Sequence, residues 1–185
     1  MTQRIGPGRD EELADVTKGR RTLTVSWTDP MALAASALSA SGLDFLTRLA
    51  AGGLPPAPIA QLMGFTLVEV ESGRVVFASE PGEQHYNPIG VVHGGLAMTL
   101  LDSALGCAVH STLPAGSRYT TLETKVNFVR PVTASTGRLL CEGRVVHRGG
   151  TVATAEGRLT IEASGKLMAH GVSTCLIVPP SSGSE

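Results

Sequence analysis

The hydrophobic and polar positions divide the chain into a helical first part and a strand-rich second part. Over residues 30–49 the apolar positions fit one or two short helices, and Ser41 followed by Asp44 has the form of an N-terminal capping box. Gly52 and Gly53 end this region, prolines follow, and residues 59–63 fit one more helical turn. The pattern predicts a helical extension over residues 29–63.

From residue 64 onward the pattern is typical of strands. Runs rich in β-branched and apolar residues, separated by turn residues such as Ser72 and Gly73, occupy residues 65–71, 74–80, 120–128, 137–147, 151–161 and 167–178. In the third run Leu122, Val126 and Phe128 alternate with polar residues, which predicts one buried face. An apolar helix is predicted over residues 94–109, so the order is two strands, one helix and four strands.

A helix that is apolar all round must be covered on most sides. An antiparallel sheet of about six strands curling around this helix would cover it, which predicts an α+β fold. We expect one such domain over residues 64–178, after the helical extension, with flexible ends at residues 1–28 and 179–185.

Composition and charge exclude several classes of function. A formal net charge of -1, without a dense stripe of Lys or Arg, argues against a nucleic-acid partner. The N-terminus lacks the features of a signal peptide, and the longest apolar stretch is too short to span a bilayer, so we expect a cytoplasmic protein without a membrane partner. The three cysteines form no CxxC pair, which favours a reducing compartment.

Motifs for cofactor and metal chemistry are missing from the sequence. The five histidines show no metal-ligand spacing with Cys or a carboxylate, so no metal site is predicted. There is no GxSxG elbow, no P-loop and no dinucleotide fingerprint, which leaves serine hydrolysis and cofactor binding unsupported.

Asp102 is the only formally charged side chain in residues 94–109. An unpaired acid among Leu, Met and Ala is costly to bury unless a metal, a counter-charge or a reaction uses it. Asp102 therefore marks the candidate active site.

Gly94 and Gly95 begin the same helix. The first N–H groups of a helix have no internal partner and can hold an oxyanion, although the two glycines could equally serve only a tight turn and close packing. Eight residues of helix separate Gly94 from Asp102, about 12 Å, so both cannot contact one carbonyl. The same helix of a second subunit, lying antiparallel, would bring Asp102 of one chain level with Gly94 of the other, which predicts a site shared across a two-fold dimer.

Several polar residues near this helix have alternative roles. The Asn87 amide could orient a water or a substrate carbonyl, but an Asx turn before Pro88 is the simpler role. His93 could bond substrate or satisfy loop carbonyls, and the structural role is favoured. Thr120, Thr121 and Thr124 bring hydroxyls that could hold a carboxylate or a water, although threonine is common in strands for other reasons.

The pattern Asn87-x-x-Gly90-x-x-His93-Gly94-Gly95, followed by Asp102 and by a strand that ends Phe128-Val129-Arg130-Pro131, resembles the PaaI-type thioesterases of the hotdog-fold superfamily. The similarity runs from about residue 54 to residue 178. It implies a hotdog thioesterase domain over residues 64–178, hydrolysis of acyl-CoA thioesters without a cofactor, and a homodimer that commonly pairs into a tetramer.

By position, the resemblance implies four catalytic residues. The catalytic carboxylate falls on Asp102, the oxyanion-hole amide on Gly94, the neighbouring asparagine on Asn87, and the assisting hydroxyl on Thr121, or on Thr120 if the alignment shifts by one. Asp102 would either activate a water as a general base or attack the thioester directly.

We expect substrate to be bound by His93, Gly95, Met98, Thr120 and Arg130. Lys125 and Arg148 are further candidates for the CoA phosphates, and Met98, Leu101 and Leu105 are candidates for the acyl pocket. Two other interpretations stay open: a hotdog dehydratase that uses His93, and a non-catalytic acyl-CoA-binding hotdog protein.

Overall fold

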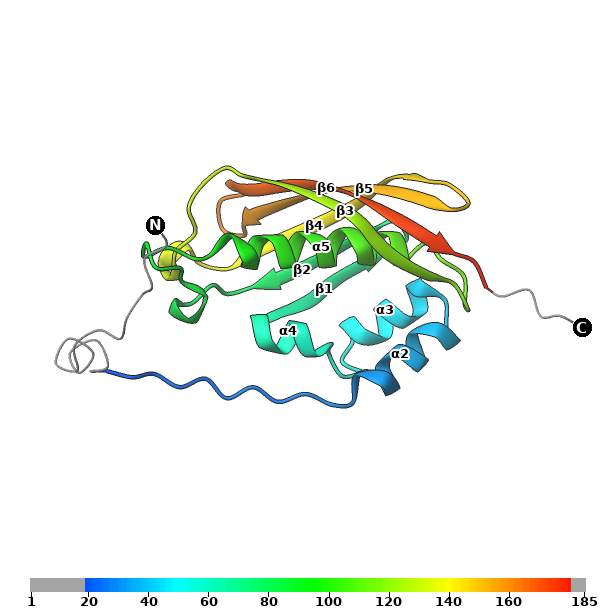
Figure 1. Ribbon diagram of the computed structural model, residues 1–185, viewed down its shortest axis with the longest axis horizontal. Helices are drawn as coiled ribbons and strands as arrows, with labels where there is room; N and C mark the ends of the chain where they lie inside the picture. The colour runs from blue at the N-terminus through cyan, green and yellow to red at the C-terminus, as the bar shows by residue number, and fades with distance from the viewer. Residues whose placement is uncertain (1–18, 181–185) are drawn as a thin grey trace, which may run out of the picture.

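A computed structural model describes residues 19–180, and its largest feature is one curved antiparallel sheet. The six strands are β1 (Phe65–Glu71), β2 (Arg74–Ser79), β3 (Arg118–Phe128), β4 (Leu139–Arg148), β5 (Val152–Ile161) and β6 (Leu167–Val178). They are arranged in the order β1-β2-β4-β5-β6-β3, with every neighbouring pair antiparallel. Helix α5 (Gly94–His110) lies along the sheet, which curves around it (Figure 1). This confirms the predicted hotdog fold and the predicted order of elements.

The centre of the core is the face of α5 that contacts the sheet. Leu100, Leu101 and Leu105 are completely buried there, and burying a side chain of this kind stabilises a fold by about 1.5–3 kcal/mol. Gly143 of β4 permits the close contact, because a Cβ at this position would lie 2.3 Å from the carbonyl oxygen of Ala104. The central helix is therefore fixed against the strands at van der Waals distance.

The helical extension consists of α2 (Pro30–Ser39), α3 (Gly42–Ala50) and α4 (Pro58–Met63). The predicted cap at the start of α3 is present: Ser41 Oγ accepts a hydrogen bond from the Asp44 N–H and donates one to Asp44 Oδ2. Helix α3 packs against β1 and α5, whereas α2 contacts α3 and buries no residue completely (Figure 1). The extension is thus attached mainly through α3.

Backbone contacts dock the extension on the far end of α5. The Gly42 N–H donates to the Leu113 carbonyl at 2.9 Å, and the Gly116 N–H donates to the Leu38 carbonyl at 2.9 Å. A Cβ at Gly42 would overlap the carbonyl oxygen of His110 at 1.7 Å, so only glycine fits here. The extension therefore has one defined position against the domain.

The two ends of the chain lie largely outside the described residues. The predictions of flexibility for residues 1–28 and 179–185 concern mostly residues 1–18 and 181–185, for which no structure is described. Residues 19–29 form neither helix nor strand, and an ion pair joins Arg21 to Glu83.

One prediction about β3 is wrong. Thr121 pairs with Cys175 and Glu123 pairs with Thr174, so Leu122 is an extra residue without a partner on β6. Such a bulge reverses the alternation of faces beyond it. Leu122 is 59% exposed and does not share a buried face with Val126, contrary to the predicted alternation.

Candidate active site

Asp102 lies on α5 and is exposed in the single chain. The expectation of a buried acid is wrong for one chain, because Asp102 lies on the side of α5 that faces the edge strand β3 and the open pocket beside it. Two hydroxyls of β3 donate to the same carboxylate oxygen: Thr121 Oγ1 at 3.0 Å and Thr124 Oγ1 at 3.2 Å from Oδ1. Among the described residues no group donates to Oδ2, so that oxygen is available for chemistry.

The bulge at Leu122 explains why both threonines reach Asp102. Residues three apart in a regular strand point to opposite faces, and the extra residue brings Thr121 and Thr124 to the same face. Thr120 is exposed and makes no side-chain hydrogen bond among the described residues, so the structure places Thr121 beside the carboxylate, not Thr120. Thr124 was not singled out as a catalytic residue, because the sequence does not reveal the bulge.

A buried serine lies beside the hydroxyl of Thr124. Ser173 is only 2% exposed, and its Oγ donates to the Glu123 carbonyl at 2.8 Å. With its own proton held by that carbonyl, Ser173 Oγ can only accept from Thr124 Oγ1, at 3.3 Å. The single proton of Thr124 is therefore shared between Ser173 Oγ and Asp102 Oδ1, which makes Thr121 the undivided donor to the carboxylate.

The start of α5 leaves one amide unpaired. His93 is the N-cap, and its Nδ1 accepts a hydrogen bond from the Gly95 N–H at 2.8 Å. Among the described residues no group accepts from the Gly94 N–H. The Phe128 ring covers Gly94, where a Cβ would lie 2.9 Å from its Cζ atom. His93 therefore has a structural role and uses the Gly95 amide, while the Gly94 amide stays available at the positive end of the helix.

Asn87 organises the loop before α5. Its Oδ1 accepts from the N–H groups of Ile89 at 3.1 Å and Val91 at 3.3 Å, the Asx arrangement that the sequence favoured. Because these two donors fix the oxygen, the Nδ2 group is the end that stays free to donate. Asn87 lines neither of the two pockets described next.

Asp102 and Gly94 line two different pockets of the chain. The first, named here the extension pocket, has a volume of about 690 Å³ and lies between the helical extension, β1, β2 and α5, with Asp102 and Thr121 in its lining. The second, the glycine pocket, has a volume of about 560 Å³ and is lined by the start of α5 and residues 128–132. One chain therefore does not bring the carboxylate and the free amide together.

Comparison with known proteins places this arrangement in a family. A model of the thioesterase superfamily matches residues 89–167. Human acyl-coenzyme A thioesterase 13 is 31% identical over 106 residues, which are 57% of this chain and 74% of the human protein. The chain belongs to the thioesterase superfamily.

Two solved structures support the assignment. A phenylacetic acid degradation-related protein of Ralstonia eutropha JMP134 is 29% identical, with a TM-score of 0.64 over 71% of this chain and 98% of that one. A Streptococcus mutans UA159 protein, whose structure was solved bound to acetyl CoA, is 28% identical, with a TM-score of 0.57 over 63% of this chain and 90% of that one. The predicted resemblance to PaaI-type thioesterases is confirmed, and the chain is a hotdog thioesterase.

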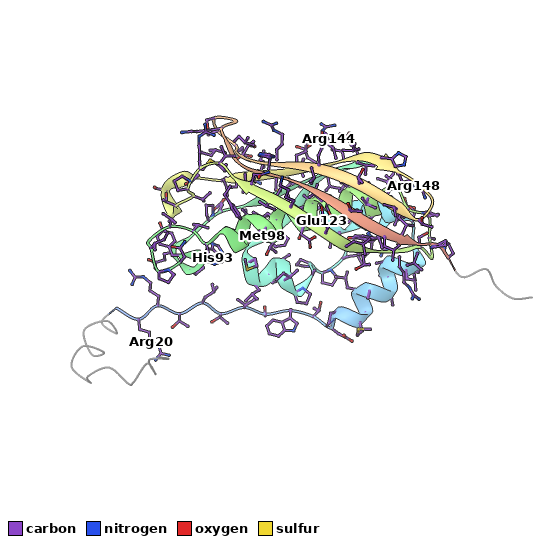
Figure 2. All side chains as sticks on the ribbon, turned by 45° about the horizontal axis from the view of Figure 1, so that its top comes forward. Arg20, His93, Met98, Glu123, Arg144 and Arg148 are labelled. Atoms are coloured by element: carbon purple, nitrogen blue, oxygen red, sulfur yellow. The ribbon has the colours of Figure 1, made fainter. Side chains whose placement is uncertain are left out.

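The glycine pocket of this thioesterase contains most of the predicted substrate-binding residues. His93, Gly95, Met98 and Arg130 line it, together with the predicted catalytic residue Gly94, whereas Thr120 lines neither pocket. The Arg130 guanidinium is fixed by a hydrogen bond from Nη1 to the Leu167 carbonyl at 2.6 Å. Lys125 and Arg148 line neither pocket, and Arg148 lies at the opposite end of the molecule from His93 (Figure 2).

Two of the predicted acyl-pocket residues are placed elsewhere. Leu101 and Leu105 are completely buried against the sheet, so the prediction that they line the pocket is wrong. The face of α5 that opens onto the extension pocket instead carries Asp102, Ser103, Gly106, Cys107 and His110. The sequence does not reveal that this face of α5 lines a pocket, because small and polar residues of this kind would equally suit a face exposed to solvent.

Burial keeps the other titratable groups of the thioesterase's extension pocket uncharged. It raises the pKa of the Cys107 thiol to about 12 and raises the pKa of Tyr119. It also lowers the pKa of His110, whose ring lies between those of Phe45 and Tyr119 at centroid distances of 5.6 and 5.3 Å. Of the described residues that line this pocket, Asp102 is the one with a carboxylate.

Within residues 19–180, no group of three or more His, Cys, Asp or Glu side chains could hold a metal ion. In the same part of the chain, no helix is both long and apolar enough to cross a membrane. The cytoplasmic location stays a prediction.

Proposed function

We propose that this thioesterase hydrolyses acyl-CoA esters to a free acid and CoA at a site shared between two copies of the chain. The observation that carries the proposal is the separation of two catalytic groups within one chain: Asp102, held by two threonine hydroxyls, and the unpaired Gly94 amide, about 12 Å away along one helix. Two antiparallel copies of α5 would bring Asp102 of each chain beside the Gly94 amide of the other.

CoA as the leaving group is supported by the relatives. The human relative is an acyl-coenzyme A thioesterase, and the S. mutans relative binds acetyl CoA. In this chain Arg130 in the glycine pocket supplies positive charge for a phosphate. His93, Gly95 and Met98 line the same pocket and would contact the substrate near its thioester.

The Gly94 N–H would stabilise the oxyanion. As a nucleophile adds to the thioester carbonyl, negative charge develops on the carbonyl oxygen, and an amide at the N-terminus of a helix lowers the energy of that charge. Removing one such donor typically costs about 3 kcal/mol of barrier. The free Nδ2 of Asn87 would be a second donor, its Oδ1 being held by the loop.

Asp102 would act through Oδ2, because both threonines occupy Oδ1. As a general base it takes a proton from water, the water oxygen forms a bond to the carbonyl carbon, and the carbon–sulfur bond breaks. The proton then passes to the CoA thiolate, so that acid and thiol are the only products. As a nucleophile, Oδ2 would bond to the carbonyl carbon and expel CoA as its thiolate, and water would then cleave the resulting mixed anhydride to the free acid and the Asp102 carboxylate, with the released proton going to the thiolate. Both routes need the ionised carboxylate.

The edge of the sheet supports a dimer. Strand β3 has eleven residues and lies at the end of the sheet, with no strand of residues 19–180 on its outer side. Long unpaired edge strands are uncommon in monomers because they invite pairing. Leu122, Phe128 and Met98, on β3 and the adjoining part of α5, are 59%, 55% and 45% exposed. A second copy that pairs along β3 would cover these side chains; a further pairing of dimers into a tetramer stays a prediction.

The proposal is tested by thiol release from a panel of acyl-CoA esters, with the wild type and with Asp102→Asn. We expect turnover by the wild type and a loss of at least about a hundredfold in kcat for the variant, with folding unchanged because the amide of asparagine has nearly the same shape as the carboxylate. Glu156→Gln, an exposed carboxylate on β5, is the matched control and should leave kcat unchanged. Saturable binding of the esters without thiol release would instead favour a non-catalytic acyl-CoA-binding protein.

A further inference from the structure

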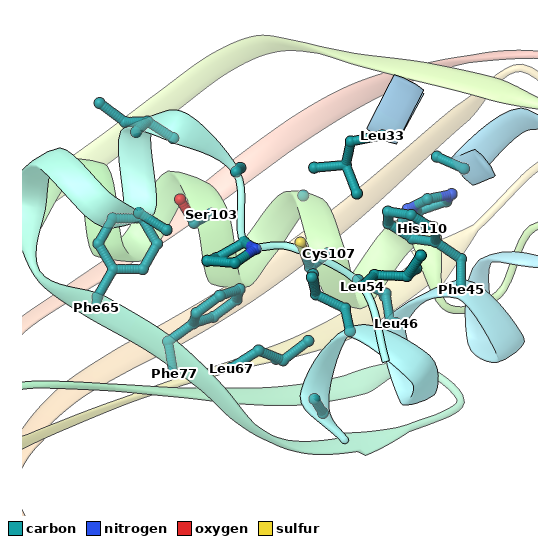
Figure 3. A pocket seen from close by; sticks show the side chains of 18 of the residues that line it. Leu33, Phe45, Leu46, Leu54, Phe65, Leu67, Phe77, Ser103, Cys107 and His110 are labelled. Carbon is teal, nitrogen blue, oxygen red and sulfur yellow. The ribbon is translucent and has the colours of Figure 1, made fainter. Parts of the chain in front are cut away.

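The extension pocket is built largely by residues that precede the hotdog domain. More than half of the residues that line it come from α2, α3, α4 and the segments between them. Figure 3 shows Leu33, Phe45 and Leu54 of this extension facing Phe65 and Phe77 of the sheet across the cavity. The extension therefore encloses a space that the domain alone would leave open on this side.

Part of this chain has no counterpart in the related structures. The R. eutropha structure is matched over 98% of its own length but over only 71% of this chain. The helical extension comes before the residues that the superfamily model matches, which begin at 89. The extension pocket is thus built in part by residues on the N-terminal side of the segment that the superfamily model matches.

The charged residues in the lining of the extension pocket limit which part of an acyl-CoA it can bind. Among the described residues that line it there is no Lys or Arg, and the one carboxylate is Asp102. CoA phosphates would be repelled and poorly solvated here, whereas an uncharged chain would be well accommodated. Phe45, Phe65 and Phe77, each less than 7% exposed, supply the apolar surface.

The position and size of the cavity point to the acyl chain. Its lining includes Asp102 and Thr121, so a thioester that reacts at Asp102 can extend its acyl group directly into it. A volume of about 690 Å³ is within the range of sites for drug-sized ligands, roughly 300–1,000 Å³, and far exceeds what a two-carbon acyl group fills.

We propose that the helical extension forms the wall of the acyl-binding pocket and makes the enzyme selective for long apolar acyl groups, with α2 as the element that sets the length accepted. The proposal rests on the acyl-CoA hydrolysis proposed above. Helix α2 is the outer wall, since Leu33 and Ala37 line the cavity while the helix buries no residue completely. Short acyl groups leave most of the pocket unfilled and gain little binding energy from it.

The test is the dependence of kcat/KM on acyl length, from acetyl-CoA through butyryl-CoA and octanoyl-CoA to dodecanoyl-CoA. The wild type should prefer dodecanoyl-CoA over butyryl-CoA by at least about tenfold. Ala37→Trp, which fills the cavity from α2, should lower kcat/KM for dodecanoyl-CoA by about tenfold or more and leave butyryl-CoA unchanged. Ala35→Trp is the matched control, because Ala35 is exposed on the same helix and does not line the cavity.

Two further measurements keep the test independent of folding and of turnover. Ala34→Trp fills the cavity from an exposed position of α2 and should repeat the effect if Ala37→Trp fails to fold. Binding of the uncleavable thioether S-dodecyl-CoA should be at least about tenfold tighter than that of S-ethyl-CoA, and Ala37→Trp should remove the difference. Equal affinity for the two thioethers, or an unchanged length profile in both tryptophan variants, would overturn the proposal. Absence of all turnover with a retained thioether preference would instead contradict only the proposed hydrolysis.

Discussion

Asp102 is held by side chains whose positions depend on one extra residue in a strand. Thr121 and Thr124 both donate to Oδ1, which they could not do from a regular strand. Hydrogen bonds to an ionised group contribute about 1.5–3 kcal/mol each. The two hydroxyls thereby fix the orientation of the carboxylate and leave Oδ2 without a donor among the described residues.

Thr121→Val should lower kcat/KM for the best acyl-CoA ester by about tenfold to a hundredfold, because the carboxylate loses one of its two positioning bonds. Thr121→Ser keeps the hydroxyl and should recover most of the activity. Thr120→Val is the control, since the neighbouring Thr120 side chain is exposed and bonds no carboxylate. Steady-state kinetics of the three variants check this, and an equal loss in Thr121→Val and Thr120→Val would contradict the assigned role.

Gly94 can be tested without removing a side chain. Gly94→Pro deletes the amide proton at the first helical position, where proline is tolerated, and the extended backbone of His93 is compatible with a following proline. Gly94→Ala keeps the proton and adds only the Cβ that meets the Phe128 ring. We expect kcat of Gly94→Pro to be about a hundredfold below that of Gly94→Ala. Equal kcat values in the two variants would show that the amide does not act on the substrate.

At the residue scale the sequence predicted some roles and missed others. Asp102 was singled out because it is the one charged residue in an apolar helix, which was taken to mean that the acid is buried. In the single chain its side chain is exposed instead. The Asx turn of Asn87 was the role that local chemistry favoured. A structural role was favoured for His93 too, but its ring caps the helix by accepting from the Gly95 N–H and does not satisfy a loop carbonyl as expected. Thr124 was one of three strand hydroxyls named as able to hold a carboxylate. That it contacts the same carboxylate as Thr121 could not be predicted, since its direction depends on pairing with β6, about fifty residues later in the chain.

At the scale of elements, local signals were sufficient for most boundaries. Gly73, with a φ of 80°, forms the turn between β1 and β2 that the Ser-Gly pair predicted, and β6 spans the predicted residues. The bulge in β3 was hidden, because an apolar Leu122 continues the alternating pattern through the extra residue. A periodic pattern specifies faces only where no residue is inserted.

The packing of α3 could not be read from its sequence either. Phe45 and Leu46 are almost completely buried, which fits an amphipathic helix, but the pattern does not say what covers them. Their neighbours are the end of α5 and β1, and the close approach depends on Gly42. The pocket forms because segments far apart in the sequence come into contact, and the local pattern of residues in α3 does not specify these contacts.

The contact of His110 with the extension predicts a pH dependence of stability. Burial lowers the pKa of His110 in the folded chain, whereas the unfolded chain keeps a value near 6.5. The unfolded state therefore binds more protons as the pH falls through 6.5, and the folded state loses stability in that range. In His110→Phe, which keeps an aromatic ring beside Phe45 and Tyr119, this loss should be absent.

Urea unfolding of both proteins between pH 7.5 and pH 5 measures the effect. The free energy of unfolding of the wild type should fall relative to that of His110→Phe as the pH decreases. A difference that stays constant over this range would contradict the assignment of a neutral, buried His110.

At the scale of the whole molecule, the proposed active site requires two chains. One chain has its carboxylate in the extension pocket and its free helix amide in the glycine pocket. In a two-fold dimer each acyl chain would enter the extension pocket of one subunit while its thioester meets Gly94 of the other. The exposed edge of β3 and the separation of Asp102 from Gly94 are then consequences of one arrangement.

The most direct test of this arrangement mixes two inactive variants. In a dimer of one Asp102→Asn chain and one Gly94→Pro chain, one composite site combines both substitutions and the other is intact. Random pairing makes half of the dimers mixed, so refolding the two variants together should restore about a quarter of the wild-type kcat per chain. Mass spectrometry under native conditions would establish that mixed dimers have formed. If mixed dimers form but release no thiol, the shared site is contradicted, and each active site must use Asp102 and Gly94 of the same chain.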